Sequence, residues 1–374
     1  MKITAAVLDS MGLPRPYAES NPLRVEELDL DYPADGEVLV RVKAAGLCHS
    51  DLSVINGDRP RPTPMALGHE AAGEVIDVGP GVYDLKPGDH VVMIFVPSCG
   101  HCPPCAEGRP ALCEPAAASN TAGTLLGGGR RLRRRGQEVN HHLGVSAFAD
   151  HAVLSRRSVI KIDQSLPFAE AALFGCAVLT GVGAVTNTAR VPAGSTVAVV
   201  GLGGVGLNSL LAASLTGARQ IIAVDVHDEK LKLALKLGAT AAVSAREADA
   251  VEQVKDLTGG GVDFAFEMAG SVRALELAYR LTRRGGTTVT AGLPPPGEAW
   301  PVPAVNLVAE ERTLKGSYVG SSVPIRDVPR YIELYQRGRL PVDKLMGEQL
   351  QLTEINSAFD RLASGLTARQ VLIF

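Results

Sequence analysis

The chain has 374 residues, of which 46% are hydrophobic and 21% charged, and its formal net charge is −3. This length accommodates about two domains with substantial cores, and the slightly acidic balance argues against a nucleic-acid partner. The N-terminus lacks the apolar core of a signal peptide, and no uncharged apolar run reaches the roughly 18 residues that span a bilayer. We therefore expect a cytoplasmic protein that does not bind membranes.

The first part of the chain has the alternation of β-strands. Residues 2–8 alternate weakly between apolar and polar side chains, whereas residues 37–42 place three valines on one face after an Asp-Gly turn signal. Residues 71–82 and 90–92 indicate further strands, separated by turns that contain glycine and proline. The N-terminal third is therefore predicted to be rich in β-structure.

Two short polar motifs interrupt these strands. The sequence CHSD occupies residues 48–51, and HE occupies residues 69–70 at the start of an apolar run. Taken singly, a cysteine or histidine in such a place is more often structural than a metal ligand. Glu70 is different, because an ionisable group beside an apolar strand needs either a buried partner or a route to solvent.

The strongest single signal is a cluster of thiols. Of six cysteines in the chain, four lie close together, at Cys99, Cys102, Cys105 and Cys113. Without a secretory signal, such crowding favours metal binding over disulfides. Four thiolates complete a tetrahedral zinc site with no open position for substrate, so the predicted role is structural, within a lobe at residues 95–115. His101 is not needed as a fifth ligand, and an oxidisable thiol cluster is the alternative.

Residues 119–140 are predicted to form a surface excursion. Three glycines at 127–129 precede five arginines within residues 130–135. Such a group could attract an anionic substrate or partner, but the acidic balance of the whole chain favours a solvated loop face. Residues 143–153 then return to a strand pattern, and residues 167–179, which include Cys176, have helical spacing.

A dinucleotide-binding unit is predicted in the middle of the chain. Residues 196–200 indicate a buried strand, GLGGVG at 201–206 a sharp turn, and residues 207–215 a helix, before a second strand that ends on Asp225. The helix start offers unpaired N–H groups to phosphates. Asp225 can bind both ribose hydroxyls and would repel a 2′-phosphate, so NAD is favoured over NADP. The alternative is a glycine-rich turn without a ligand.

The rest of the chain continues a βα rhythm. Strands are expected at 241–244, 262–267 and 287–291, and helices at 228–237, 246–257 and 272–283. This alternation is typical of a parallel sheet. Two more helices are expected at 331–337 and 355–363, and residues 370–374 are predicted to return as a strand to the first domain.

Taken together, the motifs GLCHSD, LGHE, CxxCxxCx₇C, GCAVLTG, GLGGVG and AVD make this chain resemble the zinc-dependent medium-chain alcohol dehydrogenases nearly end to end. The liver-type and glutathione-dependent formaldehyde dehydrogenase branches are most similar. The resemblance implies an α/β protein with a GroES-like, β-rich catalytic domain at residues 1–177 and 322–374. It also implies a Rossmann domain with a doubly wound parallel sheet at 178–321, and substrate in the cleft.

The resemblance also assigns the metal ligands. The catalytic zinc ligands of the family fall on Cys48, His69 and Cys176, which leave a fourth position for water or alcohol. Glu70 matches the acidic residue behind this metal, and Asp51 matches the carboxylate that orients the histidine ligand. The four clustered cysteines match the structural zinc ligands, so two Zn²⁺ ions per chain are expected.

The proton path departs from the family pattern. Ser50 matches the hydroxyl that passes the alcohol proton onward, but Ser53 stands where much of the liver-type branch has a histidine. The proton is expected to leave through ribose and water, or with help from His49. His49 also stands where an arginine commonly holds the pyrophosphate, which predicts looser cofactor binding and faster release.

Positions that match the NAD site and the substrate pocket are assigned in the same way. The cofactor is expected to contact Thr180, Gly201, Gly203, Gly204, Val205, Gly206, Asp225, Lys230, Leu293 and Arg369, besides His49. The pocket positions are Phe95, Ala118, His142, Leu143 and Leu293. A mostly apolar channel of this kind favours primary alcohols with apolar, allylic or aromatic bodies over polyols.

These assignments predict an NAD-dependent alcohol dehydrogenase that converts primary alcohols to aldehydes reversibly, by hydride transfer from a zinc-bound alkoxide. The main alternative is a thiol-dependent formaldehyde dehydrogenase acting on S-hydroxymethylglutathione. Arg59 counts against it, because that branch usually has an acid there. A non-catalytic NAD-binding sensor would be free to lose the zinc ligands, yet all are present.

Two other enzyme activities, those of polyol dehydrogenases and of zinc-independent quinone reductases, are also disfavoured. Polyol dehydrogenases often lack a complete four-cysteine lobe, and a quinone reductase of the same fold would need no zinc. A homodimer is expected, joined through the Rossmann sheets with help from the apolar segment 300–308, and a tetramer is the alternative.

Overall fold

The computed structural model describes residues 1–365 and 369–374, which form two compact units. The first unit comprises residues 1–176, 323–332 and 346–374, and the second comprises 177–322 and 333–345. Residues 333–345 thus belong to the second unit, whereas we expected the whole C-terminal stretch from 322 onward to join the first domain.

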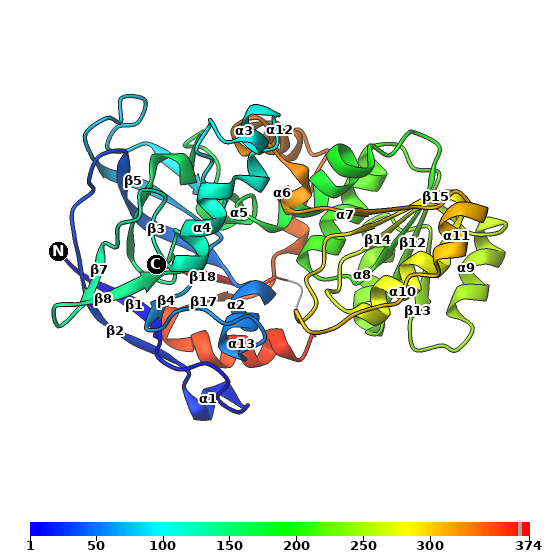
Figure 1. The fold of residues 1–374 in the computed structure, drawn as a ribbon, viewed down its shortest axis with the longest axis horizontal. Helices are drawn as coiled ribbons and strands as arrows, with labels where there is room; N and C mark the ends of the chain where they lie inside the picture. Colours follow the sequence, from blue (N-terminus) through cyan, green and yellow to red (C-terminus); the bar gives the residue numbers. More distant parts are fainter. Residues whose placement is uncertain (366–368) are drawn as a thin grey trace. The chain divides into compact units, whose positions relative to one another are not determined.

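The first unit contains a small closed β-barrel with the strand order β1-β2-β7-β8-β4 (Figure 1). Its strands are β1 (Lys2–Leu8), β2 (Leu23–Leu30), β4 (Met65–Ala66), β7 (Leu132–Arg134) and β8 (Gln137–His141). Alternating side chains such as Ile3, Ala5 and Val7 point into a shared apolar core with Leu28 and Leu132. Burial of this inner face is what closes the barrel, because each strand has only one apolar side.

A second sheet of the first unit has the order β10-β6-β5-β3-β18-β17, and β9 pairs with β3. Its strands are β3 (Glu37–Gly46), β5 (Ala71–Val78), β6 (His90–Met93), β9 (His151–Ser155), β10 (Val159–Ile162), β17 (Gln349–Leu350) and β18 (Val371–Ile373). Strand β18 runs antiparallel to β3, with Val371 opposite Gly46. The C-terminal strand therefore returns to the first unit, as the sequence predicted.

The helices of the first unit are short. They are α1 (Tyr17–Ser20), α2 (His49–Ile55), α3 (Pro103–Ala106), α4 (Glu114–Ala122), α5 (Phe168–Leu173) and α13 (Ile355–Ala363). Helix α12 (Pro324–Gln336) has residues in both units. The 3₁₀ segments of the described chain are Pro110–Leu112, Arg156–Ser158, Val319–Ser321, Val342–Leu345 and Leu352–Glu354.

The second unit is built on a parallel sheet with the order β13-β12-β11-β14-β15-β16. Its strands are β11 (Thr196–Val200), β12 (Gln220–Asp225), β13 (Ala241–Ser244), β14 (Val262–Glu267), β15 (Thr282–Thr290) and β16 (Thr313–Gly316). Because β11 lies centrally and the order reverses there, the sheet is doubly wound, with its switch point at β11. The sequence-based prediction of an α/β protein with a Rossmann-type sheet is confirmed.

Helices α6 to α11 belong to this second unit. They are α6 (Ala177–Gly183), α7 (Gly204–Leu215), α8 (Asp228–Lys236), α9 (Ala250–Thr258), α10 (Val272–Leu281) and α11 (Ala304–Ala309), with a π-helical segment at Ala184–Ala189. Buried side chains of β11, β12 and β14 pack with those of α9 and α10 in one apolar core. The strands read as continuous apolar runs because both of their faces are covered.

Two segments differ from the predicted secondary structure. The helix expected over 167–179 is broken between α5 and α6, and Cys176 lies in the break. The strand expected over 143–153 begins only at His151, because Leu143, Gly144 and Ser146 have positive φ values of 52°, 66° and 54°. A left-handed backbone cannot continue a strand. Both irregular segments carry candidate site residues.

Candidate metal centres and dinucleotide site

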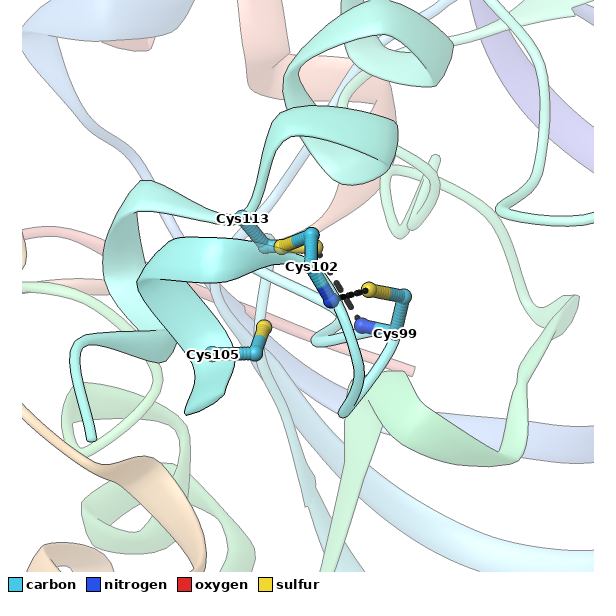
Figure 2. A group of neighbouring side chains, drawn as sticks. All are labelled: Cys99, Cys102, Cys105 and Cys113. Atoms are coloured by element: carbon cyan, nitrogen blue, oxygen red, sulfur yellow. Dashed lines mark hydrogen bonds between the residues drawn. The ribbon is translucent and has the colours of Figure 1, made fainter. Parts of the chain in front are cut away.

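Four cysteines of the first unit converge on one point (Figure 2). The sulfur atoms of Cys99, Cys102, Cys105 and Cys113 all lie within 4.8 Å of one another. Cys102 and Cys113 precede α3 and α4, Cys105 lies within α3, and Cys99 lies in the preceding loop. Backbone N–H groups reinforce the arrangement, since Cys99 donates to Sγ of Cys113 (3.2 Å) and Cys102 donates to Sγ of Cys99 (3.3 Å).

The thiols of this set differ in acidity. Bonds from the N–H groups of His101 and Cys102 lower the pKa of Cys99 to about 6. Burial, in contrast, raises the pKa of Cys105 to about 12 and also raises the pKa of Cys113. Four thiolates so close together repel one another unless a cation neutralises them. The donor set and its spacing fit a closed tetrahedral Zn²⁺ site.

A second donor set lies in the first unit and is fully buried. Ligand atoms of Cys48, His69, Glu70 and Cys176 lie within 4.8 Å of one another. Cys48 precedes α2, His69 and Glu70 precede β5, and Cys176 occupies the break before α6. Within the described residues, Nε2 of His69 is buried and has no hydrogen-bond partner. An orphaned imidazole nitrogen beside two thiols fits a Zn²⁺ ion with two sulfur ligands and one nitrogen ligand.

The local charges favour this arrangement. The neighbouring Cys176 thiol and then His69 lower the pKa of the Cys48 thiol, in spite of its burial. On the other side of His69, its Nδ1 lies 3.1 Å from Oδ1 of Asp51, and both side chains are 0% exposed. Burial opposes ionisation of Asp51, but His69 and His142 together outweigh it and hold the pKa of the carboxyl below its usual range. Asp51 therefore orients His69 with Nδ1 protonated and Nε2 directed away.

Arg369 lies against Glu70 in the first unit. Its guanidinium donates a short hydrogen bond to Oε2 of Glu70, and both side chains are buried. We expected Arg369 to contact a cofactor phosphate, but the partner that the structure shows for it is this carboxylate. The pair supplies the buried partner that the sequence required of Glu70, and it leaves Oε1 of Glu70 without a hydrogen-bond partner in the described chain.

The second unit contains the dinucleotide-type turn. The backbone passes from β11 through Gly201 and Gly203 into α7, and the carboxylate of Asp225 at the end of β12 accepts N–H bonds from Leu202 (2.7 Å) and His227 (2.9 Å). A cavity of about 540 Å³ lies beside this carboxylate. Its lining includes Gly201, Val224, Asp225, Ala269, Ser271 and Arg273.

Arg273 and Ser271, which line this cavity, were not among the predicted site residues. Both follow β14, and Ser271 caps α10 by accepting the N–H of Ala274 (3.2 Å). The signal was available, since ligands of doubly wound sheets bind beyond the carboxyl ends of the strands. Lys230, expected to bind ribose, lies on α8, and burial lowers its pKa.

The remaining predicted residues have varied surroundings. Ser50 is half-buried and His49 exposed in the first turn of α2. Phe95 packs its ring edge-on against His69 at 5.1 Å. His142 and Leu143 are buried in the first unit, and Thr180 is buried on α6. The other predicted positions are Ala118, exposed on α4, Leu293, 49% exposed, and Gly204, Val205 and Gly206, in the first turn of α7.

The arginine-rich segment is not the solvated loop that we expected. It forms the β7–β8 hairpin, and Arg131 makes two bonds to the buried carboxylate of Glu37, at 2.7 and 2.9 Å. Arg134 bridges Asp9 and Glu26 at 2.7 and 2.9 Å. The other paired arginines are Arg130 with Asn140 and Arg133 with Asp31. Acids distant in sequence therefore neutralise Arg131, Arg133 and Arg134, which explains most of this basic run without an anionic ligand.

A buried site of thiols and imidazole in one unit and a dinucleotide-type sheet in the other define the class of metal-assisted dehydrogenases. Two family descriptions match the chain: "Alcohol dehydrogenase GroES-like domain" over residues 34–164 and "Zinc-binding dehydrogenase" over residues 204–337. The chain is 38% identical over 377 aligned residues to a putative alcohol dehydrogenase D of Mycobacterium tuberculosis, with 100% of each chain covered.

Further relatives have names that point to more than one substrate. The chain is 36% identical to an S-(hydroxymethyl)glutathione dehydrogenase of Paracoccus denitrificans, covering 94% of this chain and 96% of the relative. The solved structure of a benzyl alcohol dehydrogenase from Acinetobacter calcoaceticus matches with a TM-score of 0.93 at 33% identity, covering 100% and 99% of the two chains.

The chain belongs to the zinc-dependent medium-chain alcohol dehydrogenase family. It is thus an oxidoreductase of the alcohol dehydrogenase type. In the parts of the chain that the structure describes, no helix combines the length and apolarity needed to cross a membrane.

Proposed function

We propose that this protein is an NAD-dependent alcohol dehydrogenase that converts primary alcohols to aldehydes reversibly and binds two Zn²⁺ ions per chain. The observation that carries the proposal is the buried set of Cys48, His69 and Cys176, with the free Nε2 of His69 turned toward the thiols and Asp51 behind the ring. Three protein ligands leave one coordination position for substrate, which distinguishes a catalytic site from a closed one.

Each residue has a definite task in this reaction. When bound, Zn²⁺ acts as a Lewis acid that lowers the pKa of an alcohol hydroxyl. Cys48, His69 and Cys176 hold the ion, and Asp51 keeps His69 in the tautomer that binds through Nε2. The Oγ of Ser50, half-buried in the first turn of α2, accepts the alcohol proton and passes it toward solvent. His49 on the exposed side of that turn is the candidate for the next transfer.

Asp225 supports NAD over NADP. Its carboxylate is 6% exposed and held by two backbone N–H groups at the edge of the cavity. Because both oxygens are fixed, a 2′-phosphate would meet a buried negative charge that cannot turn away, whereas ribose hydroxyls can donate to it. Glycines 201, 203 and 206, with Gly204 and Val205, are proposed to form the pyrophosphate cradle, and Lys230, Thr180 and Leu293 to complete the site.

Apolar surroundings support apolar primary alcohols as substrates. Phe95 packs on the zinc ligand His69, and Leu143 is 8% exposed. Ala118 of the same unit is proposed to extend this lining. Such a site binds the body of benzyl, allylic or straight-chain alcohols better than polyols, because a polyol would lose its hydration without gaining hydrogen bonds.

The decisive experiment combines metal analysis with a substrate screen. We expect about two zinc ions per chain and NAD-linked oxidation of benzyl, allylic and straight-chain primary alcohols, all lost in Cys176→Ser together with one zinc. Absence of zinc from Cys48, His69 and Cys176 in the purified protein would refute the proposal.

A thiol-dependent formaldehyde dehydrogenase is the second candidate, favoured by the similarity to the Paracoccus denitrificans relative. It predicts formaldehyde oxidation that depends on added glutathione. Arg59 argues against it, because a cation there would not attract the amino group of glutathione. Formaldehyde turnover measured with and without thiol separates the two functions.

A homodimer is proposed on the basis of the second unit. Strand β16 ends the described sheet, and Val305 and Val308 of α11 are 70% and 81% exposed. An edge strand beside exposed apolar side chains suits pairing with a second copy. Sedimentation of the wild type and of Val308→Asp would show a dimer that the aspartate weakens.

A further inference from the structure

We propose that His142 is a positioning residue of the catalytic zinc site, which holds the carboxylate of Asp51 and through it the ligand His69. This inference rests on the proposed function, because it needs zinc on His69. It departs from the sequence-based assignment, which placed His142 in the lining of the substrate pocket.

The carboxylate of Asp51 has three nitrogen atoms close to it. Its Oδ1 lies 3.1 Å from Nδ1 of His69, 3.2 Å from the backbone N of Gly68 and 3.1 Å from Nδ1 of His142. Its Oδ2 is buried and has no hydrogen-bond partner within residues 1–365 and 369–374. A carboxylate that is 0% exposed cannot turn to water, so the neighbouring donors decide its orientation.

His142 is itself a buried residue. Its side chain is 1% exposed, and Nδ1 has no well-aligned hydrogen-bond partner in the described chain. The nearest acceptor shown for this nitrogen is the carboxylate of Asp51, where Oδ2 is also unpaired. Since leaving a buried polar group unpaired is costly, this contact is the favoured one.

Hydrogen bonds hold the backbone around His142 in place. The N–H of His142 bonds to Oγ of Ser146 (3.0 Å), and that hydroxyl donates to the carbonyl of Ala66 (2.9 Å). Leu143 and Ser146 both have positive φ, at 52° and 54°. Non-glycine residues adopt this conformation at a cost, and such strain concentrates at functional sites. The turn thus places His142 against Asp51 and keeps it there.

The arrangement explains what His142 would do for the metal. His69 and His142 contact each other edge to face, with ring centroids 5.5 Å apart, and both direct Nδ1 toward one oxygen. With donors on two sides, Asp51 cannot swing away from His69, so the ligand ring keeps its direction. Groups that orient a metal ligand in this way typically contribute 10–100-fold to metal affinity.

Two amide substitutions separate this role from simple packing. In His142→Asn the amide nitrogen takes the place of Nδ1, whereas in His142→Gln it takes the place of Nε2. Zinc release to a chelator is followed at neutral pH. The zinc of the proposed catalytic site is identified as the kinetic phase of release that is missing in Cys176→Ser. We expect release close to wild type for His142→Asn and about 10-fold faster for His142→Gln. The d–d spectrum of the cobalt-substituted catalytic site should change only in His142→Gln.

The control is His141, the adjacent histidine, which is also 1% exposed but accepts the backbone N–H of Arg131 (3.0 Å) instead. His141→Gln should release zinc at the wild-type rate. Equal release rates in the wild type and in both His142 variants would overturn the inference. Equally fast release in the two variants would also overturn it, because loss of packing alone would then explain the effect. If the wild type holds no zinc in the Cys176-dependent phase, the proposed function itself fails.

Discussion

Two adjacent buried histidines, His141 and His142, illustrate how the surroundings of a residue decide its role. His142 faces a carboxylate, whereas His141 faces a backbone N–H and the side chains of Arg130 and Arg131. Burial first, and then the two arginines, lower the pKa of His141 to about 3. His141 is therefore neutral in the folded protein over the pH range in which an unfolded histidine titrates.

This neutral histidine predicts acid sensitivity. Below pH 6.5, the ordinary pKa of histidine, His141 binds a proton in the unfolded state, whereas in the folded state it stays neutral until about pH 3. The stability that the neutral form contributes is present above pH 6.5 and falls by about 1.4 kcal/mol per pH unit below it. In His141→Gln, urea unfolding at fixed zinc between pH 6.5 and 4.5 should show a flatter slope. A slope equal to that of the wild type would contradict the burial argument.

Asp225 is the second residue whose surroundings predict a measurable effect. Asp225→Asn keeps an acceptor for a backbone N–H but removes the charge. We expect the KM for NAD to rise about 10-fold or more, since bonds to a charged acceptor contribute about 1.5–3 kcal/mol, and the KM for NADP to fall. Asp228→Asn, an exposed acid on α8 paired with Arg246, serves as the control and should change neither constant. An unchanged ratio of the two KM values in Asp225→Asn would argue against the cofactor assignment.

At the scale of elements, two glycines in the turn between β11 and α7 have different roles, one in folding and one in ligand binding. A Cβ on Gly206 would lie 1.8 Å from the carbonyl oxygen of Gly201, so the strand and helix could not both keep their places. A Cβ on Gly203 would meet nothing within 4 Å, and its φ of −77° suits any residue. Gly203 is thus free of a folding requirement and available for close approach of a ligand.

Gly203→Ala should therefore weaken NAD binding, whereas Gly206→Ala should lower the stability of the fold. We expect Gly203→Ala to retain the wild-type melting temperature but bind NAD about 10-fold more weakly, because the methyl group displaces the pyrophosphate from the helix N-terminus. Gly206→Ala should lower the melting temperature by several degrees through overpacking of about 1–3 kcal/mol. Thermal unfolding and NADH fluorescence titration measure the two effects. Wild-type affinity in Gly203→Ala would show that no pyrophosphate lies there.

Local patterns predicted single elements well and their interruptions poorly. The strands at 196–200, 241–244 and 262–267 and the helix at 355–363 have the predicted bounds, because their apolar periodicity is the direct cause of their burial. The break that contains Cys176 was missed, since its residues are apolar and fit a helix equally well. Metal ligands favour such breaks, where the chain can direct a side chain that a regular helix would turn elsewhere.

For the whole molecule, the spacing of the four cysteines indicated by itself that Cys99, Cys102, Cys105 and Cys113 share a site. The set of Cys48, His69 and Cys176 and the doubly wound sheet were predicted only through the motifs of the family. The closed barrel and the ion pairs of Arg131 and Arg134 were not predicted, because periodicity reports that a face is buried but not which distant segment covers it. The contact between Asp51 and His142 is of the same kind.

The last prediction, at the scale of the molecule, concerns the two proposed zinc sites. Cys176→Ser should lose one zinc and all alcohol oxidation, yet keep its melting temperature within a few degrees, because the surrounding sheets are packed without the metal. Cys105→Ser should also lose one zinc but melt at least about 5 °C lower, since the lobe at residues 95–115 has a core made largely of its own cysteines and Ala116. Metal analysis, calorimetry and activity assays distinguish the variants. Equal melting temperatures for Cys105→Ser and the wild type would show that the four-cysteine site does not stabilise the fold.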